Sequence, residues 1–126
     1  MSYDAFPSKR NNPDSRVVSG SFAPNGSSAI DSSKTLGRGI KSVTYVSTGL
    51  YKVKLEDNFD KLKSWSLSIQ LSAAADKKLQ LGTVDLAASG GAELQIRSVA
   101  VGSVSDIAAD ASNRVSFEFE FGIGTN

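Results

Sequence analysis

The sequence predicts an all-β protein, an antiparallel β-sandwich of the jelly-roll or Greek-key kind that follows an extended N-terminal arm. From position 41 onward, apolar and polar residues alternate with a period of two in six separate segments, which indicates antiparallel sheets with one buried face. Gly, Asn, Asp and Ser residues form turn signals between these segments. A chain of 126 residues is long enough for one domain with a single core.

Seven or eight strands are expected, and six of them follow from the alternation directly. These six share an apolar residue at every second position, and their ranges are 41–47, 50–55, 65–71, 78–87, 92–101 and 115–121. Tyr51 and Trp65 fall in phase with the aliphatic residues of their strands, so both are predicted to pack in the core. The alternation slips by one residue at Gly82 and again near Ser98, and these slips predict β-bulges.

Residues 1–37 are predicted to form the extended arm, and residues 38–126 the sandwich. All three prolines fall in the first 24 residues, and the arm is crowded with Ser, Asn and Gly. Because ordering one residue costs about 1–2 kcal/mol of conformational entropy, we expect such a segment to stay mobile until a neighbouring protein supplies contacts. The piece 16–23 could still pair as an edge strand, and the Gly-Arg-Gly at 37–39 offers a hinge.

Composition argues against several classes of function. The chain has no cysteine and no histidine, which removes the usual general base, the Ser-His-Asp and Cys-His systems and nearly all zinc sites. We therefore expect no enzyme, no cofactor and no metal. A net charge of +1 with 21% charged residues favours neither nucleic acid nor membrane as a partner. The sequence shows no signal peptide and no apolar run of 18 residues, so we expect a protein made in the cytoplasm.

Charge is distributed unevenly along the chain. Residues 1–63 hold ten Lys/Arg and six Asp/Glu, a net of +4, whereas residues 64–126 hold four and seven, a net of −3. This asymmetry favours a surface that meets a charged partner.

Two groups of acidic residues are candidates for a metal site or a pair of catalytic carboxylates. Glu56, Asp57 and Asp60 lie between two strands, but they lack the spacing and the central glycine of a calcium-binding loop and are interleaved with lysines. A capped helical turn over 57–62, with Asp57 as its cap, is the favoured interpretation. The pair Asp106 and Asp110 is likewise interpreted as a cap and a turn within a short helical piece, 106–112.

The polar face of the strand at 65–71 has an unusual composition. It presents Ser64, Ser66, Ser68, Gln70 and Ser72, all uncharged, where a solvent-exposed strand usually carries Lys or Glu to prevent pairing with other chains. We therefore predict that this face contacts another protein.

Two stretches, GRGIKSVTYVSTGLYKVKLEDNFDKL and DIAADASNRVSFEFEF, resemble a family of small tailed-bacteriophage virion proteins over about residues 37–121. The family carries a G-x-G…V…T-G-x-Y-x-V-x-L-x-D-x-[YF] stretch and a final strand that follows A-D…N-x-R/V. The positions that match are Gly37, Gly39, Val43, Thr48, Gly49, Tyr51, Val53, Leu55, Asp57, Phe59, Asp110, Asn113 and Val115.

The resemblance implies a jelly-roll decoration, or cement, protein that binds the outside of the assembled phage head. Such a protein bridges capsomers through its sandwich and its arm, has the major capsid protein as its partner and forms a homo-oligomer, either a trimer or a dimer. The residues expected at partner contacts are Arg16, Val17, Val18, Phe22, Ile30, Lys34, Arg38, Ser66, Ser68 and Gln70. The alternatives are a phage tail or fibre component that recognises a host surface glycan, and an unrelated carbohydrate-binding sandwich.

Overall fold

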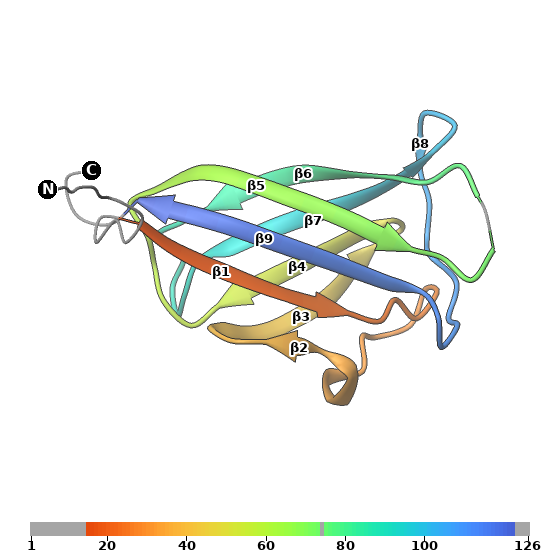
Figure 1. Ribbon diagram of the computed structural model, residues 1–126, viewed down its shortest axis with the longest axis horizontal. Coiled ribbons are helices and arrows are strands. Elements are labelled where there is room, and N and C mark those ends of the chain that lie inside the picture. The colour runs from red at the N-terminus through yellow and green to blue at the C-terminus, as the bar shows by residue number, and fades with distance from the viewer. Residues whose placement is uncertain (1–14, 74, 123–126) are drawn as a thin grey trace, which may run out of the picture.

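The computed structural model describes residues 15–73 and 75–122, and it consists of two antiparallel sheets packed face to face (Figure 1). One sheet has the strand order β2-β1-β9-β5, and the other has the order β3-β4-β7-β6 with β8 attached to β7. The strands are β1 (Ser15–Phe22), β2 (Leu36–Gly37), β3 (Ile40–Ser47), β4 (Leu50–Leu55), β5 (Lys61–Gln70), β6 (Lys78–Asp85), β7 (Glu93–Ala100), β8 (Ser103–Val104) and β9 (Arg114–Gly122). The predicted antiparallel β-sandwich is confirmed.

The chain winds so that its first described strand pairs with its last. β1 runs antiparallel to β9 along its whole length, from Ser15 opposite Gly122 to Phe22 opposite Val115. Along the sequence, β4 and β7 lie between β1 and β9, and they pair antiparallel to each other in the other sheet. β5 then extends the first sheet beyond β9, and β6 extends the second sheet beyond β7. Such nested pairing is typical of jelly-roll sandwiches.

The core lies between the two sheets and is built from alternate residues of the central strands. The buried hydrophobic residues of β9 are Val115, Phe117, Phe119 and Phe121. They meet the buried hydrophobic residues of β4 and β7 in the other sheet, which are Tyr51, Val53, Leu55, Leu94 and Ile96. Full burial of one such side chain contributes about 1.5–3 kcal/mol. The alternation in 115–121 therefore predicted the buried face of β9 correctly.

The structure differs from the predicted arm over residues 15–37, because this stretch belongs to the sandwich. Val18 and Phe22 of β1 are buried in the core, and the rings of Phe22 and Tyr51 lie 5.2 Å apart. Gly20 interrupts the apolar alternation between them because β2 passes close by: a Cβ at Gly20 would lie 2.5 Å from the carbonyl oxygen of Leu36. Residues 1–14 of the predicted arm lie outside the described residues.

The two predicted helical pieces are not helical. Residues 57–60 form an irregular corner that leads into β5, and residues 106–110 form an irregular segment followed by a turn. Hydrogen bonds from distant parts of the chain satisfy the carboxylates that were expected to cap helices: Asp57 accepts from Arg16, and Asp106 accepts from the backbone amide of Gly49. Among the described residues, Ser32–Lys34 is the one helical segment, a single 3-10 turn.

One of the two predicted bulges is present. The pairing of β6 with β7 shifts register between Leu81 and Val84, around Gly82. Near Ser98 the pairing continues without a shift, because Ser98 itself occupies the inward position next to Leu94 and Ile96 and is fully buried.

Candidate partner-binding surface

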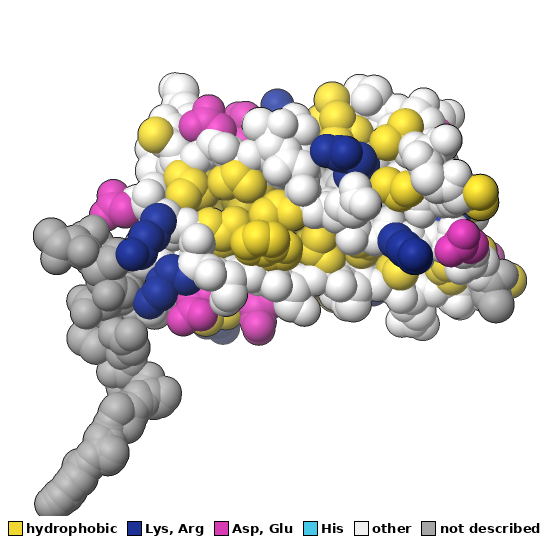
Figure 2. Space-filling view, turned by 90° about the horizontal axis from the view of Figure 1, so that it is seen from above, with side chains coloured by type: hydrophobic (Ala, Val, Ile, Leu, Met, Phe, Trp, Pro, Cys, Tyr) yellow, Lys and Arg dark blue, Asp and Glu magenta, His cyan; other side chains and the backbone are white. Residues whose placement is uncertain are grey.

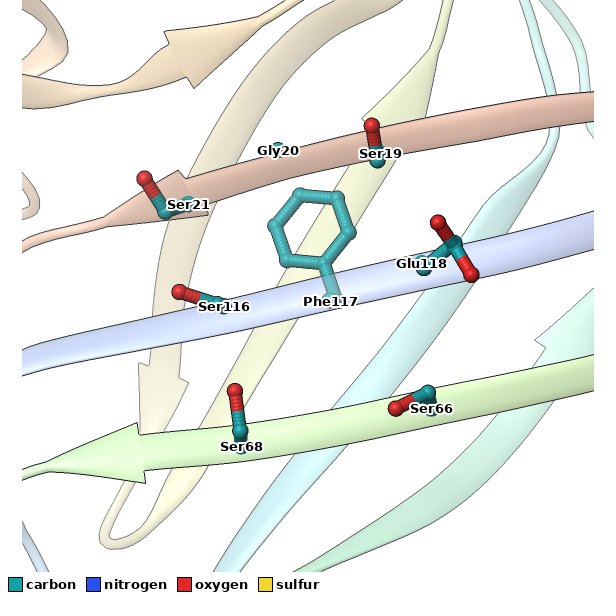
Figure 3. Close-up of a pocket in the computed structure, with 8 residues that line it drawn as sticks. All are labelled: Ser19, Gly20, Ser21, Ser66, Ser68, Ser116, Phe117 and Glu118. Carbon is teal, nitrogen blue, oxygen red and sulfur yellow. The ribbon is translucent and has the colours of Figure 1, made fainter.

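The outer face of the β2-β1-β9-β5 sheet carries a hollow of about 390 Å³ that is lined mostly by serine residues. We call its five serines the serine floor: Ser19 and Ser21 from β1, Ser66 and Ser68 from β5, and Ser116 from β9. Figure 3 shows their side chains on the three neighbouring strands together with Gly20, Phe117 and Glu118. The hollow thus offers hydroxyl groups and one carboxylate, a polar lining without an exposed apolar side chain.

The register of the strands places these serines in two adjacent rows. One row contains Ser19, Glu118 and Ser66, and the other contains Ser21, Ser116 and Ser68. Between the rows lies the pair of Gly20 and Phe117, and the Phe117 side chain is buried in the core. Five of the six side chains in these two rows are serines, and their shortness leaves the face low at its centre.

Longer and charged side chains surround the hollow. At one end, Glu120 accepts a hydrogen bond from the hydroxyl of Ser64, with 3.1 Å between the oxygens. At the other end, the Arg114 guanidinium donates to the carbonyl oxygen of Lys34 at 2.8 Å, which ties the 3-10 turn to β9. Leu36, 57% exposed, lies opposite Ser21 in the register of β1 with β2. The face is therefore acidic at one end and basic at the other.

The structure separates the ten predicted contact residues into three groups. Ser66 and Ser68 lie in the hollow, and Gln70 and Val17 are exposed on the strands that carry it. Val18 and Phe22 lie in the core, so their prediction as contact residues is wrong: they alternate inward along β1 and pack against the opposite sheet. The third group lies away from the hollow and consists of Arg16, Ile30, Lys34 and Arg38.

Arg16 and Ile30 have structural contacts of their own. The Arg16 guanidinium donates to the carboxylate of Asp57 at 2.8 Å, and its carbon lies 5.6 Å from the centre of the Phe59 ring. Ile30 is partly buried against the core. Arg38 is exposed in the turn between β2 and β3. Their predicted contacts with a partner stay predictions.

Three members of the serine floor were not predicted, namely Ser19, Ser21 and Ser116. Each occupies a polar position in an apolar alternation, which is a signal visible in the sequence. The signal does not identify them as one site, because β1 and β9 are neighbours only through the register of two strands about a hundred positions apart.

Asp106 stabilises the fold by accepting hydrogen bonds from two other residues. Asp106 accepts from the amide of Gly49 at 2.8 Å and from the hydroxyl of Tyr45 at 3.3 Å. Desolvation, with a smaller contribution from the hydrogen bond to Asp106, raises the pKa of Tyr45 above its ordinary value. Desolvation likewise raises the pKa of Tyr51. Within residues 15–73 and 75–122, no three His, Cys, Asp or Glu residues gather closely enough to hold a metal ion.

Comparisons with known proteins found no relative for this chain: no family model, no curated protein and no solved structure matches it significantly. A search of the described residues for helices that are long and apolar enough to span a membrane found none.

Proposed function

We propose that the protein is a structural virion protein, a decoration protein that binds the outside of an assembled phage head. The observation that carries the proposal is the serine floor, which lines a hollow on an exposed sheet face together with the single carboxylate of Glu118. Its hydroxyl groups can both donate and accept hydrogen bonds, so they can pair with backbone amides and carbonyls of another protein. Short side chains let such a backbone approach closely.

The composition of this face favours a protein partner over a small apolar ligand. Ligand pockets are usually enclosed and lined mainly by apolar and aromatic side chains, whereas this hollow is lined by five serines and the carboxylate of Glu118. The sheet that carries the hollow packs on the other sheet through core aromatic rings, since the centroids of Phe22 in β1 and Tyr51 in β4 lie 5.2 Å apart. The face is therefore a rigid surface that loses little conformational entropy on binding.

The proposed mechanism is stabilisation by mass action. A protein that binds the assembled shell and not its free subunits stabilises each site by about 2.7 kcal/mol at a hundredfold excess over Kd. Many identical sites on one head multiply this effect. In this proposal the partner is the major capsid protein, the protein acts as a homo-oligomer on the capsid exterior, and it is made in the host cytoplasm.

The alternative, a tail or fibre component that binds a host glycan, has one observation in its favour. Trp65 is 52% exposed, and an exposed aromatic ring is a surface on which sugars stack. Trp65 alternates with Ser64 and Ser66 along β5 and so projects from the opposite side of the strand. Trp65 and the serine floor therefore do not form one sugar site, which favours decoration.

The experiment that tests the proposal is the stoichiometry of the chain in purified virions. A decoration protein is present at a copy number comparable to that of the major capsid protein, whereas a tail component is present in a handful of copies. Binding to heads that lack the protein, measured by cosedimentation, is then compared for the wild type and for the variant Ser116→Arg, which fills the hollow. Val101→Arg is the matched control, because Val101 is 86% exposed in the turn before β8.

We expect Ser116→Arg to weaken binding to heads at least tenfold and Val101→Arg to leave it unchanged. A low copy number together with glycan binding by the isolated chain would overturn the proposal in favour of the tail component. Unchanged binding of the folded Ser116→Arg variant would remove the serine floor from the interface.

A further inference from the structure

The edge of β5 is open over a long and regular stretch. β5 pairs with β9 on one side and with no other described strand on its other side. Its single register shift falls between Leu62 and Ser64, so residues 64–70 form a continuous strand that contains neither a charged residue nor a proline. Natural proteins usually protect such an edge with lysine, proline, a bulge or a covering segment, because its free backbone groups can pair with another chain.

An apolar strip accompanies this edge. β5 and β6 are the outermost strands of the two sheets on the same side of the sandwich, and Figure 2, which looks onto that side, shows a stripe of hydrophobic side chains there. The strip consists of partly buried or exposed residues of the two strands: Trp65, Leu67, Ile69, Leu79, Leu81 and Val84. Within the described residues, no strand or loop covers it fully.

We propose that β5 pairs with β5 of a second copy of this chain, antiparallel and with the two-fold axis at Leu67. In this register Trp65 faces Ile69 of the copy, and Leu67 faces Leu67 of the copy. On the other side of the strand, Ser64 faces Gln70 and Ser66 faces Ser68. Every facing pair is thus either apolar or uncharged and polar, so the edge is complementary to itself, as a two-fold interface requires.

The charges around the edge fit this arrangement. Lys61 and Lys63 precede the matched stretch, so no lysine faces a lysine of the copy. In the outer face, Glu120 lies beside Ser64 and Arg114 lies beside Gln70. The pairing of Ser64 with Gln70 of the copy therefore places Glu120 of one copy in the same row as Arg114 of the other, about 14 Å away across three strand spacings.

The dimer has a consequence for the shape of the outer face. It joins the two β2-β1-β9-β5 sheets into one continuous sheet of eight strands, and the two serine floors then lie on the same side of it. Pairing also covers the apolar strips of both copies. The inference does not rest on the proposed function, because the dimer can be measured with the isolated full chain and no capsid.

A cysteine placed on the proposed axis tests the register directly. The chain has no cysteine, so Leu67→Cys carries one thiol, which faces the same thiol of the second copy. Opposed residues of antiparallel strands have Cα atoms about 4.5–5.5 Å apart, which lies within the range that a disulfide bridges. Ser64→Cys is the matched control, since its two copies would lie about 20 Å apart along the strands.

We expect mild oxidation to convert most of the Leu67→Cys chain into a covalent dimer on a non-reducing gel and to leave Ser64→Cys monomeric. Equal crosslinking of the two variants, or none of Leu67→Cys in a folded protein, would overturn the register.

Sedimentation of the full chain tests the proposed dimer interface while Leu67, the residue on the two-fold axis, stays unchanged. Wild type should sediment as a dimer at about 100 μM, a concentration at which micromolar association is complete. Trp65→Lys places a charge in the apolar strip and should weaken the dimer at least tenfold. Leu36→Lys, a similarly exposed apolar residue at the opposite edge of the same sheet, should not.

Circular dichroism and thermal unfolding of each variant confirm that it is folded. A monomeric wild type at this concentration, or a Trp65→Lys dimer as stable as that of the wild type, would overturn the proposal. Either result leaves the binding to heads separately measurable, so failure of the dimer and failure of the proposed function are distinguishable.

Discussion

The carboxylate of Asp106 accepts a hydrogen bond from the backbone amide of Gly49, with 2.8 Å between the oxygen and the nitrogen. The two residues are 57 positions apart. Gly49 has a φ of 65° in the turn between β3 and β4, a left-handed conformation that glycine adopts without steric cost. The segment that follows β8 therefore fixes the hairpin that delivers β4 to the core.

Removal of this carboxylate should destabilise the fold. Asp106→Ala leaves the Gly49 amide without its partner, and we expect the free energy of unfolding to fall by about 1–3 kcal/mol. Asp106→Asn keeps an acceptor oxygen at the same place and should lose less. Urea denaturation followed by tryptophan fluorescence measures both. Equal stabilities of the two variants would show that the charge of Asp106, and not its hydrogen bond, matters.

Gly91 should not tolerate a side chain. Its φ is 134°, and a Cβ there would collide with the carbonyl oxygen of Leu55, which is backbone and cannot rotate away. We expect Gly91→Ala to cost about 3 kcal/mol or more, or to prevent folding. Gly102→Ala is the control: its φ is also positive, at 80°, but no atom lies within 4 Å of the added Cβ. Its cost should stay near about 1 kcal/mol, and thermal unfolding compares the two.

Ser98 should be replaceable by alanine without loss of stability. Its side chain is fully buried, and its Oγ has no hydrogen-bond partner among the described residues. A buried hydroxyl without a partner carries a desolvation cost, so Ser98→Ala should be neutral or stabilising by up to about 1 kcal/mol. The urea midpoint at constant m value measures the change. A clear loss of stability would reveal a bound water on this hydroxyl.

The free energy of unfolding should fall at acidic pH, partly because the Glu93 carboxylate becomes protonated. Lys54 donates to the Glu93 carboxylate at 2.9 Å and also to the carbonyl oxygens of Ser89 and Gly91. The hydrogen bond from Lys54 holds the pKa of Glu93 below its ordinary value. Since the folded-state pKa is the lower one, the contribution is present above the unfolded-state value of about 4.3 and is lost as the pH falls through the folded-state pKa.

The variant Glu93→Gln should therefore show a smaller loss of stability than wild type between about pH 7 and pH 3. Lys54→Gln should reduce the same pH dependence, because it removes the cause of the lowered pKa. Identical pH profiles of wild type and Glu93→Gln, measured by urea denaturation, would contradict the assignment.

In β5 and β9, the alternation of apolar and polar residues predicts burial correctly for one strand and incorrectly for the other. Both strands alternate apolar and polar residues, and both patterns predict a buried apolar face. Phe119 is fully buried, whereas Trp65, its partner in the register, is 52% exposed. The prediction that Trp65 packs in the core is therefore wrong, because β9 is a central strand covered by the opposite sheet and β5 is the outermost strand of its sheet.

The sequence by itself determined the fold class and most of the strands, because burial of one sheet face imposes a period of two on the side chains of each strand. It also determined the polar face of β5, which includes Ser66 and Ser68. Only the tertiary structure decided which strands are neighbours and which are edges. Those contacts place β1 beside β9, bring serines from three strands into one hollow, and leave the β5 edge open. Alternation along a strand carries no information about the strand that lies next to it.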